Sequence, residues 1–156
     1  MGAFHRMQQD IVVKVKRVGE GRTELPEYAS AGAAGLDLAA NIPSPMIIPA
    51  GGRERIPTGV AVQMPDRYLV GLVFARSGLA SRYGVNLANS VGVIDSDYTG
   101  EIICVLQNNG DESYTVRPGD RIAQLVFLPL AVASLQLVSE LEETTRGTGG
   151  FGSTGV

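Results

Sequence analysis

Tryptophan is absent from the 156-residue chain, and cysteine and histidine occur once each. The single cysteine, Cys104, cannot close an intrachain disulfide, and its apolar surroundings (IICVL) predict a buried core thiol. His5 lies in a segment expected to be disordered, which excludes an imidazole-based metal site and a Ser–His triad. No run approaches the roughly 18 apolar residues of a membrane span, and residues 1–10 lack the apolar segment of a signal peptide. We expect a soluble protein of the cytoplasm, or of the nucleus or an organelle if its source is a eukaryote.

Positive charge is also in short supply, with 13 Lys and Arg against 16 Asp and Glu. Proteins that bind nucleic acid through its phosphates carry a basic surplus, so no nucleic-acid partner is expected, and without an apolar span no membrane partner either. The length and the 44% of hydrophobic residues fit one domain with a real core. We expect a single domain over 1–156, with residues 1–9 disordered, a β core over 10–145 and a mobile segment over 146–156.

Twenty glycines and eight prolines interrupt the sequence so often that a long helix is excluded. Short apolar, β-branched runs bounded by turn residues are typical of strands, and Val13 and Val15 alternate with lysines as in a half-buried strand. Strands are expected over 10–18, 68–75, 101–106, 121–128 and 130–141, with a hairpin-type turn over 108–111 and one short helix over 77–83. This pattern predicts an all-β fold, a distorted jelly-roll sandwich or barrel with one short helix and a flexible C-terminal tail.

Two segments carry groups that suit either a turn or an anion. Residues 31–40 (AGAAGLDLAA) place one carboxylate, Asp37, in an apolar stretch, where it caps a turn or serves a site. Arg76, Ser77 and Gly78 follow an apolar strand and open the expected helix. A guanidinium, a hydroxyl and free N–H groups suit a phosphate, although a Ser N-cap with a solvent-facing Arg fits equally well.

A third segment, residues 91–101 (VGVIDSDYTGE), holds two carboxylates. Asp95 and Asp97 are two positions apart, which predicts that they share one face of a strand or hairpin. A carboxylate that follows the apolar run 91–94 is a candidate general base. Two acids and Tyr98 at a hairpin tip also suit an ordinary turn.

The C-terminal segment, residues 146–155 (RGTGGFGSTG), contains G-x-G-x-x-G. That fingerprint binds dinucleotides only after a strand and at the start of a helix, and four remaining residues cannot form a helix, so a Rossmann site is rejected. A glycine-rich segment can wrap an anion with its N–H groups, with Arg146 for charge and Ser153 and Thr154 as donors. A frayed terminus is the alternative.

Together these segments resemble the five ordered motifs of the trimeric deoxyuridine triphosphate nucleotidohydrolases (dUTPases). The motifs read AGAAGLDL (31–38), ARSGLASRYGV (75–85), NSVGVIDSDYTGEI (89–102), PGDRIAQLVF (118–127) and RGTGGFGSTG (146–155). Their order and spacing match over nearly the whole chain from residue 10 onward. The resemblance implies a jelly-roll subunit and a homotrimer whose three sites lie at subunit interfaces. It also implies hydrolysis of dUTP to dUMP and pyrophosphate, which keeps uracil out of DNA and supplies dUMP for thymidylate synthesis.

The resemblance assigns roles to individual residues. Asp95 is the implied general base for a water that attacks the α-phosphorus, and Asp37 and Gln124 would hold waters of a Mg²⁺ ion. The residues implied to contact the phosphates are Arg76, Ser77, Gly78 and Gln124, with Arg146, Ser153 and Thr154 from a closing lid. Those implied to contact the uracil and deoxyribose are Asn89, Gly92, Val93, Tyr98 and Phe151, with Phe151 stacked on the base.

Three alternatives remain open from the sequence. A dCTP deaminase shares the fold and the triphosphate site, but it needs a general-base Glu where this chain has the turn 95–98. A nucleotide-gated interaction protein would use an inserted loop, for which the motif spacing leaves no obvious room. A purely structural jelly-roll module would need neither the C-terminal segment nor Asp95.

Overall fold

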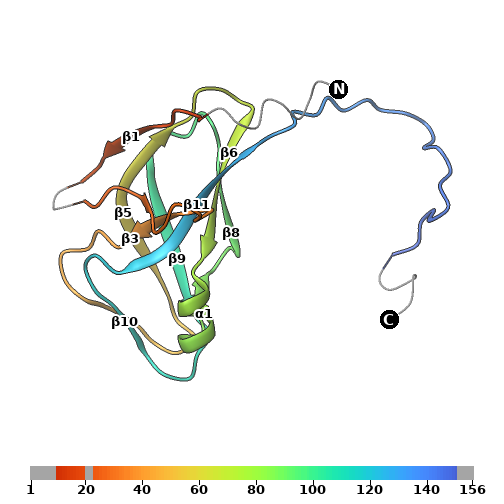
Figure 1. The fold of residues 1–156 in the computed structure, drawn as a ribbon. Coiled ribbons are helices and arrows are strands. Elements are labelled where there is room, and N and C mark those ends of the chain that lie inside the picture. The colour runs from red at the N-terminus through yellow and green to blue at the C-terminus, as the bar shows by residue number, and fades with distance from the viewer. Residues whose placement is uncertain (1–9, 20–22, 151–156) are drawn as a thin grey trace.

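Two antiparallel β-sheets pack against each other to form the body of the protein (Figure 1). The computed structural model describes residues 10–19 and 23–150. The first sheet has the order β1 (Lys14–Arg17), β5 (Arg53–Gln63), β9 (Glu101–Asn108) and β7 (Val85–Leu87). The second has the order β2 (Glu27–Tyr28), β3 (Leu36–Ala39), β11 (Arg121–Pro129), β6 (Leu69–Ala75) and β8 (Val91–Ile94). A separate pair joins β4 (Met46–Ile48) to β10 (Tyr114–Val116). The all-β sandwich is confirmed, and the sheets formed by the described residues do not close into a barrel.

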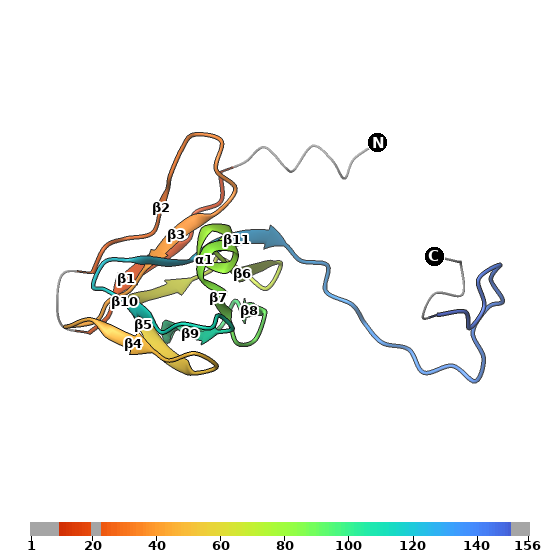
Figure 2. The ribbon, with the colours of Figure 1, turned by 90° about the horizontal axis from the view of Figure 1, so that it is seen from below.

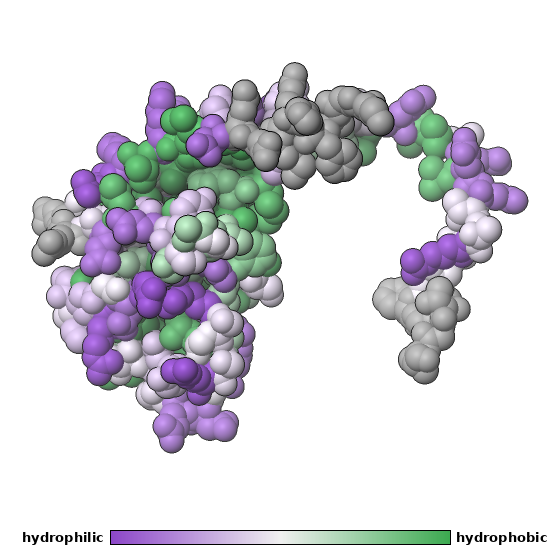
Figure 3. Space-filling view, in the orientation of Figure 1, coloured by the Kyte–Doolittle hydropathy of each residue, from purple (hydrophilic) through white to green (hydrophobic). Residues whose placement is uncertain are grey.

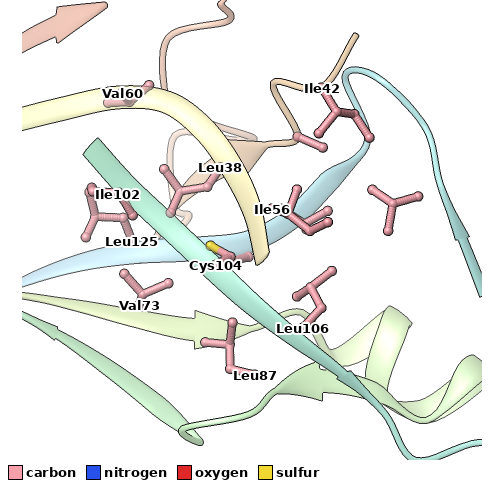
Figure 4. Close-up of a cluster of buried hydrophobic side chains, with 14 of the residues drawn as sticks. Leu38, Ile42, Ile56, Val60, Val73, Leu87, Ile102, Cys104, Leu106 and Leu125 are labelled. Carbon is pink, nitrogen blue, oxygen red and sulfur yellow. The ribbon is translucent and has the colours of Figure 1, made fainter. Parts of the chain in front are cut away.

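The hydrophobic core lies between the two sheets (Figure 4). Along β9, Ile102, Cys104 and Leu106 are buried while Ile103 faces outward, because successive side chains of a strand point to opposite faces. From the second sheet the same cluster takes Leu38, Val73, Ile122, Ala123 and Leu125. The prediction of a buried thiol at Cys104 is confirmed.

Helix α1 (Ser77–Tyr83) connects β6 to β7, within the bounds predicted from the sequence. It ends at Gly84, whose φ of +68° lies in the left-handed region that favours glycine. A Cβ atom on Gly84 would lie 2.6 Å from the backbone nitrogen of Gly110. This close approach lets the helix end pack against the body, where the rings of Tyr83 and Tyr114 lie 5.0 Å apart.

The strands predicted over 68–75, 101–106 and 121–128 are confirmed as β6, β9 and β11. The strand predicted over 10–18 is confirmed by β1. Its half-burial holds only for Val13, which packs partly buried against the core just before β1, whereas Val15 and the rest of β1 are exposed. Within residues 10–19 and 23–150, β1 is an edge strand paired with β5 alone. The turn over 108–111 does not close a hairpin, since β9 pairs with β5 and β7 while β10 pairs with β4.

The strand predicted over 130–141 is wrong. After β11 ends at Pro129, residues 131–150 leave the body as an extended arm (Figures 1 and 2), called the arm below. The backbone N–H of Leu130 donates to the carbonyl oxygen of Tyr68, at 2.7 Å, where the arm departs. Leu135 and Leu137 are 96% and 99% exposed. The apolar residues that suggested a strand therefore have no partner strand in the described part of the chain. Among the described residues, no helix is long and apolar enough to cross a membrane.

Asn108 is a fully buried polar side chain that holds three backbone groups. Its Nδ2 donates to the carbonyl oxygens of Ile48 and Glu112, at 3.0 and 2.8 Å, and its Oδ1 accepts from the N–H of Gly110 at 2.9 Å. We expect Asn108→Ala to lower the free energy of unfolding by at least about 3 kcal/mol, because it leaves buried backbone groups unpaired. Urea unfolding measures this, and Asn109→Ala, at an exposed neighbour, is the matched control. Equal losses in both variants would contradict the assignment.

Burial raises the pKa of the Cys104 thiol to about 12, from an ordinary value of 9.0. Since the unfolded chain loses this proton first, the contribution of Cys104 to stability is complete below about pH 9 and declines above it. Between pH 9 and pH 10 the free energy of unfolding should fall by about 1 kcal/mol more in the parent protein than in the Cys104→Ala variant. All other groups titrate in both proteins, so the comparison isolates the contribution of Cys104. Native Cys104 should also resist iodoacetamide at pH 8.5 and react once urea unfolds the chain. Rapid alkylation of the native protein would refute this.

Candidate active site

Three adjacent strands bring together residues from three of the sequence motifs. β3, β11 and β6 are neighbours in the second sheet, with Gln124 of β11 opposite both Asp37 of β3 and Phe74 of β6. Arg76 directly follows β6. Opposite residues of antiparallel strands share a face, so Asp37 and Gln124 lie together. The Gln124 Nε2 donates to the carbonyl oxygen of Ala75, at 3.3 Å.

The Asp37 carboxylate is bound by two guanidinium groups. Its Oδ1 lies 3.2 Å from Arg76 Nε, and its Oδ2 accepts a hydrogen bond of 3.0 Å from Arg121 Nη1. Arg76 Nη1 also donates to the main-chain carbonyl oxygen of Arg121, at 3.2 Å. Asp37 thus belongs to a strand and to an ion-pair cluster, and the turn-capping alternative is wrong.

A hollow of about 540 Å³ opens over this cluster, and we call it the cationic hollow. Of the residues expected at the phosphates, Arg76, Ser77, Gly78 and Gln124 line it, and so does Asp37, which was expected at the metal ion. Gly35 leaves room for the glutamine, since a Cβ there would lie 3.1 Å from the Gln124 Oε1. Guanidinium, hydroxyl and amide groups converge here around a single carboxylate, a set that suits a phosphate chain.

Ser77 is the first helical residue of α1 and not its N-cap. Arg76 occupies the N-cap position, and no side chain caps the helix. The Arg76 carbonyl oxygen accepts the N–H groups of Leu79 and Ala80. The Ser77 hydroxyl is therefore not used for capping, so the plain Ser N-cap alternative is wrong. Ser77 and Gly78 are both exposed, and both border the cationic hollow.

A second hollow, of about 290 Å³, lies beside β8, and we call it the hairpin hollow. The residues expected on the nucleoside side line it: Asn89, Gly92, Val93, Asp95 and Tyr98. Asn89 sits in the tight turn before β8, where Ser90 adopts a φ of +63°. Among the described residues, β8 is the edge strand of its sheet and pairs only with β6, so backbone N–H and C=O groups on its other side have no partner strand there.

Asp95 begins a turn and does not continue β8. The strand ends at Ile94, and the N–H of Tyr98 donates to the carbonyl oxygen of Asp95 at 3.1 Å. The strand periodicity predicted for Asp95 and Asp97 is wrong for this reason. Only Asp95 of the two lines the hairpin hollow.

The sequence did not single out Glu101, which accepts a hydrogen bond from Tyr98, nor Gly59 and Gly100 around it. The Tyr98 hydroxyl donates to the carbonyl oxygen of Glu101, at 2.9 Å, and the Glu101 Oε1 accepts the N–H of Gly59 at 2.7 Å. A Cβ on Gly100 would lie 2.6 Å from the Tyr98 hydroxyl. The glycine at position 100, two residues after Tyr98, is the sequence signal that could have indicated this arrangement. A tyrosine ring that folds back over the following residues needs the space that a Cβ at position 100 would occupy.

The two hollows share no lining residue in the described part of the chain. Arg146 lines neither hollow, and its Nε donates to the carbonyl oxygen of Gly149, at 3.0 Å, within the arm. Figure 3 shows the arm standing away from the body. Phe151, Ser153 and Thr154 lie outside the described residues. The body of one chain thus gathers Arg76, Ser77, Gly78 and Gln124 at one hollow and Asn89, Gly92, Val93 and Tyr98 at the other, without Arg146.

The side chains around the cationic hollow suit a Mg²⁺ ion that keeps several of its waters. Asp37 is the one carboxylate among the described residues that line it. Across the ranges 10–19 and 23–150, no three His, Cys, Asp or Glu side chains cluster as metal ligands. Mg²⁺ keeps several waters and binds through one or two carboxylates and substrate phosphates, so it does not need a protein cage. Asp37 with the Gln124 amide matches that requirement.

Comparisons with known proteins all indicate the same family. The sequence profile of the dUTPase family matches residues 22–155. The deoxyuridine 5'-triphosphate nucleotidohydrolase of Desulfitobacterium hafniense strain DCB-2 is 52% identical over 147 residues, covering 94% of this chain and 97% of the relative. That of Photorhabdus laumondii is 44% identical over 151 residues, covering 96% and 99%.

Solved structures agree with the sequence relatives. The Staphylococcus bacteriophage 80alpha dUTPase with dUpNHpp superposes with a TM-score of 0.82 at 28% identity, covering 93% of this chain and 99% of that one. A mutant dUTPase of Staphylococcus aureus phage phi11, described with a structural Mg(II) ion, gives 0.74 at 25% identity, covering 85% and 99%. The sandwich is therefore a jelly roll of the kind these enzymes have. This chain belongs to the dUTPase family, because the family profile matches most of its length and a relative is 52% identical to it.

Proposed function

We propose that this protein hydrolyses dUTP to dUMP and pyrophosphate. The observation that carries the proposal is the pair of hollows with complementary chemistry. One offers guanidinium and hydroxyl groups, which suit a triphosphate, and the other offers a free strand edge and a carboxylate, which suit a base and a reaction with water. Such hydrolysis would keep uracil out of DNA and supply dUMP for thymidylate synthesis.

The cationic hollow binds the phosphate chain in this proposal. Arg76 and Ser77 contact it, with Gly78 at the helix start and Gln124 from β11. When bound, Mg²⁺ neutralises charge on the triphosphate and holds its geometry. Asp37 and Gln124 would hold that ion through its waters. Arg146, Ser153 and Thr154 close over the γ-phosphate as a lid that excludes water.

Asp95 is the proposed general base. Its carboxylate takes a proton from a water molecule whose oxygen attacks the α-phosphorus. The new bond joins the water oxygen to that phosphorus, and the bond from the α-phosphorus to the oxygen bridging it to the β-phosphorus breaks. Pyrophosphate leaves with the electron pair of that bond. Asp95 suits this role because it lies at the start of the turn that borders the hairpin hollow.

The hairpin hollow selects the base and the sugar. The free edge of β8 near Gly92 and Val93, with Asn89 beside it, pairs with the uracil edge. Cytosine presents an amino donor where uracil presents a carbonyl acceptor, which would leave buried groups unpaired. In this proposal the tight turn before β8 also leaves no room for the methyl group of thymine. Tyr98 packs under the sugar and excludes a 2′-hydroxyl, while Phe151 stacks on the base.

We also propose a homotrimer in which each site combines three chains. Residues of the hairpin hollow come from one subunit, the cationic hollow from a second and the C-terminal lid from the third. Two observations support this arrangement: the hollows are separate in one chain, and the arm exposes apolar residues such as Leu135 and Leu137. Covering such side chains with another copy of the chain would stabilise the assembly.

The first test measures substrate preference and the role of Asp95. With Mg²⁺ present, the protein should release pyrophosphate from dUTP but not from dCTP, dTTP or UTP. Ammonia released from dCTP would instead support the deaminase alternative. Asp95→Asn keeps the side-chain shape without the basicity, so it should lower turnover by about 10²- to 10⁴-fold while dUpNHpp still binds. Asp111→Asn, an exposed acid outside both hollows, is the control. An Asp95→Asn rate above about a tenth of the original would remove Asp95 from this role.

The second test uses hybrid trimers. Chains with Asp95→Asn and chains cut after Thr145 should each be nearly inactive, because one lacks the base and the other lacks the lid. After co-refolding in equal amounts, about a quarter of the sites should combine an intact base with an intact lid from different chains. Pyrophosphate release and the molar mass in solution are the measurements. Separately refolded chains, mixed only at assay, are the control. A stable active monomer, or no recovery after co-refolding, would rule out the shared site.

A further inference from the structure

A β-bulge at the start of β11 sets the direction of Arg121. The pairing of β11 with β3 shifts register between Arg121 and Ala123, so that Arg121 lies opposite Ala39 and Ala123 lies opposite Leu38. Ile122 and Ala123 are consecutive yet both buried, at 1% and 0% exposed. Regular alternation would turn one of them outward. The extra residue instead returns Arg121 to the outer face, a common use of bulges beside functional sites.

On that outer face Arg121 meets Asp37 from the side opposite the cationic hollow. Arg121 and Asp37 line a different hollow, of about 750 Å³, to which Arg76 does not contribute. Arg76 and Asp37 line the cationic hollow, to which Arg121 does not contribute. The Asp37 carboxylate therefore separates the two arginines, with one oxygen for each. Arg121 is placed to act on the carboxylate and not on a ligand in the cationic hollow.

We propose that Arg121 is a positioning residue that fixes Asp37 and, through it, Arg76. The inference rests on the proposed function of the cationic hollow. The contact that carries it is the 3.0 Å hydrogen bond from Arg121 Nη1 to Asp37 Oδ2. The 3.2 Å hydrogen bond from Arg76 Nη1 to the main-chain carbonyl oxygen of Arg121 does not depend on the Arg121 side chain, so the variants below leave it in place. With its Oδ2 held by Arg121, the carboxylate presents Oδ1 to Arg76 Nε in one orientation.

Arg121 should contribute little to stability, because its side chain is 55% exposed and exposed ion pairs contribute little. Its effect should instead appear in the function of the hollow, since a group that orients a carboxylate beside a bound ion or substrate typically changes affinity or activity by about 10- to 100-fold. The melting temperature and the kinetics therefore report different roles. Loss of a merely structural arginine would lower the melting temperature, and loss of a positioning arginine would change the kinetics.

The experiment compares Arg121→Met with Arg117→Met, which removes the same charge from the turn just before β11. Arg121→Met should melt within a few degrees of the parent, lower kcat/KM for dUTP by about 10- to 100-fold and weaken dUpNHpp binding measured without Mg²⁺. Arg117→Met should behave as the parent does. Arg121→Lys keeps the charge without the planar fork, so it should fall between the two. Parent-like kinetics and binding for Arg121→Met would overturn the proposal.

A double-mutant cycle separates indirect from direct action. If Arg121 acts through Asp37, adding Arg121→Met to Asp37→Asn should cause little further loss, because residues that act through one contact are not additive. Fully additive losses would mean that Arg121 contacts the substrate itself and would overturn the positioning role. Arg121→Lys in the same cycle gives the answer if the methionine variant does not fold. Failure of the parent protein to hydrolyse dUTP would instead count against the proposed function.

Discussion

The antiparallel alignment of β3, β11 and β6 is the constraint on which the site depends. It places Gln124 opposite Asp37 and leads the chain from the end of β6 directly into Arg76. These residues are far apart in sequence, and only the register of three strands makes them neighbours. A one-residue slip of β11 would turn Gln124 inward and an apolar side chain outward, because the faces of a strand alternate. The buried residues Ile122, Ala123 and Leu125 oppose such a slip, so the core that stabilises the sandwich also fixes the site.

The charge at this site is organised around one carboxylate. Asp37 lies between Arg76 and Arg121, each on a different side, so the excess positive charge of the cluster faces the cationic hollow through Arg76. Exposed ion pairs contribute little stability, and the value of this arrangement lies in geometry. An arginine already held in one orientation loses less conformational entropy when it binds a phosphate than a free one does.

The single chain forms the parts of a site without joining them. The cationic and hairpin hollows are separate, and the arm extends from β11 with leucines exposed. These features have one physical explanation in the proposed trimer, where the surfaces left open by one chain are covered by its copies. The exposed edge strand β1 agrees with this explanation. The jelly-roll body, which is similar to that of a solved phage dUTPase, is the rigid frame that carries both hollows.

The sequence by itself determined the all-β class, helix α1 and strands β6, β9 and β11, because these follow from local apolar runs, glycine and turn residues. It also indicated residues that line the two hollows, since each of their motifs is a contiguous segment of the chain. It failed where a side chain depends on distant partners. Residues 130–141 have the composition of a strand but no adjacent strand in the described chain. Asp95 and Asp97 were expected on one face of a strand or hairpin, with a turn as the alternative, and a backbone hydrogen bond makes their segment a turn. Only the tertiary structure decided that Arg121 reaches Asp37, because a bulge is a property of two paired strands and leaves no mark in one.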